Sequence, residues 1–217
     1  MKASNWAIAL HGGAGTILKA NMTDEKDKLY REGLSDALSA GTSILARNGS
    51  AVDAVEATVK ALEDHELFNA GKGSVLTADE TCELDASIMD GRTLDTGAVI
   101  GVSRIQNPVE LARLVMNRSD HVALAGAGAE RFADRCGLEF VGPEYFDTPH
   151  RRAQLADAKV NDEVSLDHSD HKYGTVGAVA RDRSGHLAAA TSTGGMTNKA
   201  PGRVGDSPMI GAGTYAS

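Results

Sequence analysis

The sequence predicts an α+β fold in which long helices precede and separate strands of the hairpin type. Two capped helical segments follow one short apolar strand near the N-terminus. The pair Asp90-Gly91 stands between two strand-like runs, which is typical of a β-hairpin, and a second hairpin is expected around Ser184. Helices and antiparallel strands grouped in this way favour a layered α+β arrangement over a chain of βαβ units.

The composition predicts a single acidic domain in the cytoplasm. The 217 residues, 41% of them hydrophobic, are enough for one core. The formal net charge of −8 argues against a nucleic-acid partner, because phosphate binding needs a basic face. The apolar runs are too short to cross a bilayer or to form a signal peptide. Cys82 and Cys136 are far apart in the sequence and are expected to be reduced thiols.

The N-terminal helices carry clear end signals. After the first apolar run and the glycine loop HGGAG, a long helix is expected to begin with Thr23 as N-cap and to stop at Gly49. Ser50 is expected to cap a second helix, with Asp53 as the acid of a capping box. Apolar residues at helical spacing after Ser50 predict the face that packs on the core.

The middle of the chain alternates strands and helices. The helix NPVELARLVMNRS should open with Asn107 as cap, Pro108 in the first turn and Glu110 as capping-box acid. A strand, HVALAG, and a helix closed by Gly137 should follow. A short helix is then expected over 150–159.

The segment at about 156–174 is polar and acidic and shows neither a helical nor a strand period, which predicts a flexible linker. Its residues Asp167, His168, Asp170 and His171 allow two interpretations, a solvated linker or a transition-metal site. After the linker, two strand-like runs predict the second hairpin. The final stretch is a loop rich in glycine and proline.

Several common site motifs are absent from the sequence or incomplete. Gly126 and Gly128 open a helix after a strand, but Arg131 stands where a dinucleotide-binding loop needs a third small residue. The HGGAGT loop lacks the GK[ST] ending of a phosphate-binding loop. The chain also lacks the GxSxG, HExxH and kinase signatures.

Threonines at the second hairpin suggest a different chemistry. Thr175 and Thr193 would lie at matching open ends of the hairpin, with Thr191 nearby. A threonine hydroxyl needs a base, and cleavage after Gly174 would supply one as the new α-amino group of Thr175. The alternative is that these are ordinary strand threonines.

These residues lie in segments that resemble the plant-type L-asparaginases, or isoaspartyl peptidases, of the N-terminal-nucleophile hydrolases, and the bacterial members in particular. The resemblance is carried by the following segments: HGGAGTI, ALEDHELFNAGKGSV, ELDASIMDG, GAVIGVSRIQNPVELARLVM, GTVGAVA, TSTGGMTNK and PGRVGDSPMIGAGTYA. It covers nearly the whole chain and implies a four-layer αββα sandwich.

The resemblance implies that Thr175 is a nucleophile freed by autocleavage after Gly174. An α subunit would then comprise residues 1–174, and residues 175–217 would begin a β subunit. Thr193 matches the threonine that hydrogen-bonds to the nucleophile and helps to activate it, and Thr191 is a supporting neighbour. Two processed precursors would assemble into an (αβ)2 heterotetramer.

The resemblance also implies the substrates. In the segment GRVGDSP, Arg203 matches the residue that binds the α-carboxylate of the substrate, and Asp206 matches the one that binds its α-ammonium; Val204 and Gly205 lie between them. A guanidinium suits a carboxylate and a carboxylate suits an ammonium. L-Asparagine would yield aspartate and ammonia, and β-aspartyl dipeptides would yield aspartate and the remaining residue.

The segment LEDHELFNAGKG implies a structural sodium ion. The resemblance implies no organic cofactor. The ion would be bound by main-chain carbonyl oxygens, which suit a hard cation. The matching positions are Leu62, Glu63, His65, Phe68, Ala70 and Lys72. Gly12 and Gly13 resemble a mobile loop near the nucleophile.

Members of this family continue for about another third of their length after GAGTYA, and that part carries an oxyanion-hole motif and further strands. We therefore expect the C-terminal strands of the sandwich to be missing from the 217 residues. Two alternatives to an asparaginase and isoaspartyl peptidase remain at this point. One is a catalytically silent chain that folds or functions only with a partner subunit, and the other is a specificity like that of glycosylasparaginase.

Overall fold

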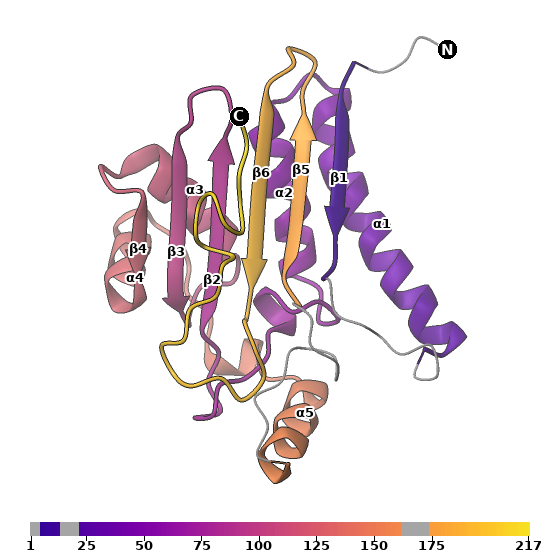
Figure 1. The fold of residues 1–217 in the computed structure, drawn as a ribbon, viewed down its shortest axis with the longest axis vertical. Helices are drawn as coiled ribbons and strands as arrows, with labels where there is room; N and C mark the ends of the chain where they lie inside the picture. The colour runs from indigo at the N-terminus through magenta and orange to yellow at the C-terminus, as the bar shows by residue number, and fades with distance from the viewer. Residues whose placement is uncertain (1–4, 14–21, 162–173) are drawn as a thin grey trace.

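The computed structural model describes residues 5–13, 22–161 and 174–217, which form a mixed six-stranded sheet with helices beside it (Figure 1). The strand order is β1-β5-β6-β2-β3-β4, and all neighbouring strands are antiparallel except β3 and β4. The strands are β1 (Ala7–His11), β2 (Leu84–Asp90), β3 (Thr96–Val102), β4 (Ala123–Ala125), β5 (Val176–Arg181) and β6 (Leu187–Thr193). The α+β prediction is confirmed.

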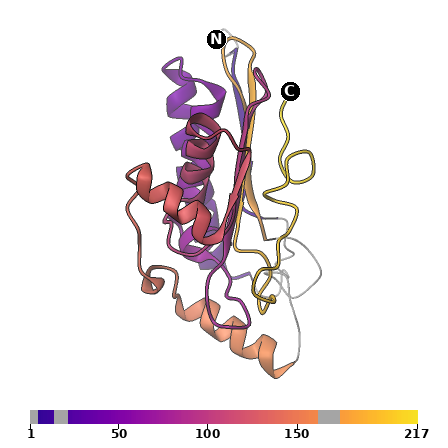
Figure 2. The ribbon, with the colours of Figure 1, turned by 90° about the vertical axis from the view of Figure 1, so that its left-hand side faces the viewer.

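The α-helices are α1 (Asp24–Ala46), α2 (Ala51–Glu63), α3 (Pro108–Arg118), α4 (Gly126–Arg135) and α5 (Pro149–Val160). Figure 2 shows helices on one face of the sheet and the C-terminal segment along the other face. The helix α2 packs against β5 and β6, while α3 packs against β2 and β3. The helix α5 lies beyond one end of the sheet (Figure 1). The described residues thus build one helical layer on one sheet.

Helix-end signals in the sequence predict α1 and α2 well. The side chain of Thr23 accepts a hydrogen bond from the main-chain N–H of Lys26, and that of Ser50 accepts one from Asp53. The end of α1 differs from the prediction, because Asn48, with φ of 64°, and not Gly49 adopts the left-handed conformation. Asparagine tolerates this conformation better than most residues.

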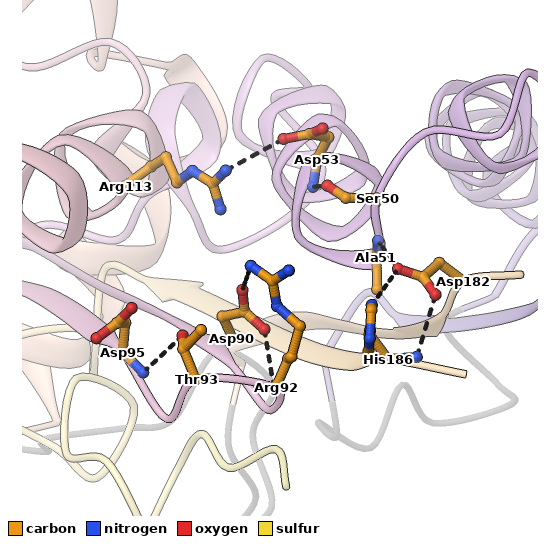
Figure 3. Close-up of polar contacts among 10 residues, drawn as sticks. All are labelled: Ser50, Ala51, Asp53, Asp90, Arg92, Thr93, Asp95, Arg113, Asp182 and His186. Atoms are coloured by element: carbon orange, nitrogen blue, oxygen red, sulfur yellow. Dashed lines mark hydrogen bonds and ion pairs between the residues drawn. The ribbon is translucent and has the colours of Figure 1, made fainter. Parts of the chain in front are cut away.

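The carboxylate of Asp53 points away from its own helix end and accepts a hydrogen bond of 3.2 Å from Arg113 of α3 (Figure 3). The N-terminus of α2 receives a different carboxylate. Asp182, between β5 and β6, lies with Oδ2 3.4 Å from the main-chain nitrogen of Ala51. Its Oδ1 accepts hydrogen bonds from the main-chain N–H groups of Ser184 and His186. One buried carboxylate therefore holds the hairpin turn against the start of α2.

Both predicted hairpins are present. The strands β2 and β3 are joined through a loop in which Asp90 accepts a hydrogen bond from the main-chain N–H of Arg92, and Thr93 accepts one from that of Asp95 (Figure 3). The strands β5 and β6 pair from Val176 opposite Ser192 to the turn. This register brings the residues that flank Val176 and Ser192 together at the open end.

The predictions for the start of α3 and for the linker need correction. Asn107 precedes α3, but its side chain does not cap the helix; it donates instead to Asp64 at 3.0 Å, while Glu110 forms an ion pair with Lys60. The helix α5 continues to Val160, so the first residues of the predicted linker are helical. The helix gains its own N-cap from Thr148, which the composition of the segment does not reveal. The remainder of the linker, with the four possible metal ligands, lies outside the described residues.

Among the described residues, no helix combines the length and apolar character that a bilayer crossing requires.

Candidate active site

The open end of the β5–β6 hairpin carries the two threonines that the sequence singles out. Thr175 immediately precedes β5, and Thr193 is the last residue of β6. Because Val176 pairs with Ser192, Thr175 lies opposite Thr193 when the register is continued. Thr193 is buried, whereas Thr175 is half-buried and partly open to solvent.

The hydroxyl groups of these two threonines have different partners. Thr175 Oγ1 lies 2.9 Å from Ser207 Oγ, where either oxygen can be the donor. Thr193 Oγ1 accepts a hydrogen bond of 2.9 Å from the main-chain N–H of Gly195. In the uncut chain, Ser207 is therefore the hydroxyl partner of Thr175, and Thr193 orders the turn that follows β6.

A small pocket brings together most of the predicted catalytic and substrate-binding residues. It is lined by Gly174, Thr175, Thr193, Gly195, Met196, Arg203, Gly205, Asp206 and Ser207. The guanidinium of Arg203 lies against Gly195 and Gly205, where a Cβ atom would come within 3.4 Å and 3.2 Å of Nη1 respectively. The side chain of Val204 is partly exposed, and Val204 does not line this pocket. Arg203 and Asp206 thus line the same pocket as Thr175.

Thr191 lies in a buried hydroxyl cluster beside this pocket, which we define as Ser87, Thr191 and Thr214. Thr191 Oγ1 lies 3.1 Å from Ser87 Oγ and 2.6 Å from Thr214 Oγ1. Ser87 and Thr191 each donate to the main-chain carbonyl of Ser207, at 2.7 Å and 2.8 Å. Ser207 therefore contacts both threonines, Thr191 through its carbonyl and Thr175 through its hydroxyl.

Two buried titratable groups adjoin residues of the pocket: Asp85 of β2 pairs with Thr193, and Lys199 lies against Gly195, and each is 1% exposed. Lys199 Nζ donates to the carbonyl of Glu83 at 2.8 Å, and Asp85 Oδ1 accepts from the N–H of Gly101 at 2.9 Å. Burial raises the pKa of Asp85, and the charges of Lys199 and Arg203 oppose this rise. Burial likewise lowers the pKa of Lys199, against the attraction of Asp85 and Glu83.

The N-terminal glycine loop meets the other side of the threonine. His11 ends β1 opposite Gly177 of β5, and its ring makes a hydrogen bond to the main chain of Thr175. Burial lowers the pKa of His11, while this hydrogen bond acts in the opposite direction. A Cβ atom on Gly13 would lie 3.5 Å from the Cα of Gly174. His11 and Gly13 therefore lie against the Gly174-Thr175 segment.

The six positions that match a sodium site run from the last two residues of α2, Leu62 and Glu63, into the loop that follows, where the main chain is tightly wound. Gly71 has a φ of 50°, and a Cβ atom there would collide with the carbonyl of Glu63. A Cβ atom on Gly73 would collide with the carbonyl oxygens of Phe68 and Glu66. Carbonyl oxygens are the donors that a hard cation prefers, and those of Glu63 and Phe68, two of the six positions, lie against these glycines.

Four of the six predicted carbonyls also accept main-chain hydrogen bonds. Those of Leu62, His65, Phe68 and Ala70 accept from residues two or three positions further along the chain. Each carbonyl oxygen has a second lone pair that can contact a cation. Across the described parts of the chain, no cluster of three or more His, Cys, Asp or Glu side chains could hold a metal.

The cysteines take no part in this site. Cys82 is buried, and burial raises the pKa of its thiol to about 12. A thiol of that kind is protonated at neutral pH and is a poor nucleophile. Cys136 is half-buried at the end of α4. Both are free, in agreement with the sequence prediction.

The family model described as Asparaginase matches residues 4–217. The chain belongs to the asparaginase family. It is 54% identical over 216 residues to the isoaspartyl peptidase of Salmonella typhimurium, covering 97% of this chain and 69% of that protein. It is 48% identical over 209 residues to the isoaspartyl peptidase/L-asparaginase of Mus musculus, covering 96% of this chain and 63% of that protein.

A plant member of the asparaginase family is also similar. The probable isoaspartyl peptidase/L-asparaginase 2 of Arabidopsis thaliana is 43% identical over 236 residues, covering 98% of this chain and 72% of that protein. The family resemblance inferred from the sequence motifs is thus confirmed in bacterial and plant members alike.

Two residues at this asparaginase-family site are not predicted by the sequence. Ser207 directly follows Asp206 in the segment GRVGDSP, but nothing in its spacing marks it as a partner of Thr175. Asn69 was also missed: its side chain accepts from the N–H of Val75 and donates to the carbonyl of Gly195 at 2.8 Å. It therefore connects the predicted sodium loop to the turn after Thr193, a contact across 126 positions of sequence.

Proposed function

We propose that this chain is an autoprocessing amidohydrolase that uses Thr175 as an N-terminal nucleophile. It would hydrolyse L-asparagine to L-aspartate and ammonia, and it would cleave β-aspartyl dipeptides. The observation that carries the proposal is the single pocket that contains Gly174, Thr175, Arg203 and Asp206. Membership of the asparaginase family and the names of the similar proteins support the same substrates.

The charges in the pocket match the free end of an aspartyl group. Arg203 can bind the α-carboxylate through its planar guanidinium, and Asp206 can bind the α-ammonium. A substrate held at both groups presents its β-carbonyl and not its α-carbonyl to the nucleophile. This arrangement favours asparagine and isoaspartyl peptides over ordinary α-linked peptides, because in the latter the α-carboxylate is consumed in the peptide bond.

Cleavage before Thr175 converts a weak nucleophile into an active one. The new α-amino group has an ordinary pKa near 7.7–8.0, so a substantial fraction is neutral at pH 7.5 and can take the hydroxyl proton. Attack on the β-carbonyl forms a β-aspartyl ester on Thr175 and releases ammonia or the peptide remainder. Water then hydrolyses the ester and releases aspartate. Thr193 is proposed to support Thr175 in this step by hydrogen bonding once the new terminus has formed.

We also propose the finer family features for this chain. The segment from Leu62 to Lys72 would hold a structural sodium ion, whose positive charge would bind main-chain carbonyl oxygens in fixed positions. The chain would be processed into subunits 1–174 and 175 onward that pair as an (αβ)2 heterotetramer in the cytoplasm. The complete fold would be a four-layer αββα sandwich, to which the described sheet and helices contribute two layers.

The test uses the purified full-length protein and two variants. Intact mass and N-terminal sequencing should reveal a fragment that begins at Thr175, and the protein should release aspartate from asparagine and β-aspartyl-leucine but not from α-aspartyl-leucine. Thr175→Ala should remain one uncut band without activity. Thr93→Ala, an exposed threonine between β2 and β3, is the matched control and should behave as wild type. Activity in uncut protein, or equal cleavage of both dipeptides, would contradict the proposal.

A further inference from the structure

Among the residues that the structure describes, a buried serine is the hydrogen-bond partner of the Thr175 hydroxyl. Ser207 Oγ lies 2.9 Å from Thr175 Oγ1, within the range of an O–H···O hydrogen bond. Ser207 is 3% exposed, so bulk water does not compete freely for this contact. The ring of His11 makes a hydrogen bond to the main chain of Thr175. The direction of the Thr175 hydroxyl is therefore set by Ser207.

The main-chain carbonyl of Ser207 is held by the hydroxyl cluster of Ser87, Thr191 and Thr214. The carbonyl oxygen accepts from Ser87 at 2.7 Å and from Thr191 at 2.8 Å, and Thr214 Oγ1 lies 3.4 Å away. The cluster joins β2, β6 and the C-terminal segment, all of which are buried at these positions. A main chain held at this point leaves the Ser207 side chain little freedom to move away from Thr175.

We propose that Ser207 is a catalytic residue of the autocleavage before Thr175, an inference that rests on the proposed function. Its hydroxyl accepts the hydrogen bond from Thr175 Oγ1–H and so aims an oxygen lone pair at the carbonyl carbon of Gly174. The C–O bond to Thr175 Oγ1 forms, and the C–N bond of the Gly174-Thr175 peptide breaks. The hydroxyl proton ends on the nitrogen of Thr175, which becomes the α-amine. Water then hydrolyses the ester, which releases the carboxylate of Gly174 and restores the hydroxyl.

A serine hydroxyl suits this task because it orients without ionising. A carboxylate at this position would be desolvated in a buried site, which makes its charged form costly. The Ser207 hydroxyl keeps its own proton while the Thr175 proton passes to the nitrogen. Autocleavage occurs once per chain and does not require rapid turnover. Correct orientation of the attacking oxygen is therefore the main contribution to its rate.

The test follows uncut full-length precursor after synthesis and measures the rate at which the two fragments appear. Ser207→Ala removes the hydroxyl but keeps the carbonyl that the cluster holds, and we expect cleavage about tenfold slower or more, the effect of one lost hydrogen bond of about 1.4 kcal/mol in the transition state. Ser207→Cys keeps a weaker partner of similar size and should fall between wild type and Ser207→Ala. Thr58→Val is the control, since Thr58 is a fully buried threonine of α2 whose hydroxyl donates within its own helix.

Hydroxylamine separates an orienting role from a loss of packing. It attacks esters faster than water does, so it accelerates cleavage only where the ester accumulates. Because the defect of Ser207→Ala precedes the ester, hydroxylamine should leave its rate well below that of wild type. Cleavage of Ser207→Ala at the wild-type rate, or restoration of the full rate by hydroxylamine, would overturn the role of Ser207. Absence of cleavage in wild type itself would instead contradict the proposed function.

Discussion

Arg151 Nε lies 2.6 Å from the carbonyl oxygen of Gly73, and this hydrogen bond joins α5 to the loop after α2. The side chain of Arg151 is almost completely buried, and its Nη1 also contacts Gln154 at 2.9 Å. The same loop holds Asn69, which donates to the carbonyl of Gly195 beside the candidate site. A buried arginine outside the pocket therefore supports the loop that connects the helical layer to the site.

Replacement of Arg151 by methionine should destabilise the protein by about 2 kcal/mol, because it removes a charge-assisted hydrogen bond and leaves the carbonyl of Gly73 unsatisfied. Urea unfolding monitored by circular dichroism measures this loss. Arg152→Met is the matched control, since that neighbouring side chain is exposed and its ion pairs with Asp147 and Glu80 contribute little. Equal losses in the free energy of unfolding for the two variants would show that the buried hydrogen bond contributes no more to stability than the exposed ion pairs.

Close contact between α1 and α2 depends on the small size of Gly41. A Cβ atom at this position would collide with Thr58 Oγ1 and with Ile8 Cδ1, and it would lie 3.0 Å from the carbonyl of Ala54. Gly41→Ala should therefore cost about 1–3 kcal/mol of stability, despite the higher helix propensity of alanine.

The control for Gly41 is Gly128→Ala in α4, where a Cβ atom would meet nothing nearer than Arg131 at 3.9 Å. This second substitution should stabilise the protein by about 0.5–1 kcal/mol. Thermal unfolding compares the two variants directly. A stable Gly41→Ala protein would mean that the two helices can separate without loss of packing.

The raised pKa of Asp85 predicts a specific pH dependence. The folded state keeps the Asp85 proton at a pH where the unfolded chain has lost it, so above the ordinary value of 3.8 the folded state binds more protons. Stability contributed by the neutral carboxyl is then lost as pH rises from 3.8 towards the raised pKa. The groups that face Asp85 are Lys199, Arg203 and Glu83, and their charges modulate the size of this effect.

The test of this pH dependence is Asp85→Asn, which cannot titrate. Free energies of unfolding measured between about pH 4 and pH 7 should fall more steeply in wild type than in Asp85→Asn. Asp95→Asn, at an exposed residue between β2 and β3, is the control and should keep the wild-type slope. Parallel curves for wild type and Asp85→Asn would show that Asp85 has the same pKa in both states.

Substrate affinity should depend on Arg203. If its guanidinium binds the α-carboxylate, Arg203→Ala should raise KM for asparagine about 10- to 100-fold, the range for hydrogen bonds to charged groups. Autocleavage should continue, because Arg203 takes no part in the proposed attack of Thr175 on Gly174. Arg131→Ala, at an exposed arginine of α4, is the control. An unchanged KM in mature Arg203→Ala protein would remove Arg203 from the binding site.

The sequence by itself predicted most of the elements and much of the candidate site. Caps such as Thr23 and Ser50 and the turn before the second hairpin are signals within a few residues, so they predict α1, α2 and the β5–β6 hairpin correctly. The hairpin in turn brings Thr175 opposite Thr193, because strand pairing follows from the position of the turn. The motif resemblance placed Arg203 and Asp206, which line the same pocket.

Only the tertiary structure decided how these residues are held. The contact of Thr175 with Ser207 spans 32 positions, and those of Ser87 with Ser207 and Asn69 with Gly195 span 120 and 126. Such pairs meet because the sheet order sets β2 beside β6 and the C-terminal segment crosses the sheet face. Local periodicity records which face of an element is buried, but it does not record which distant hydroxyl lies against that face.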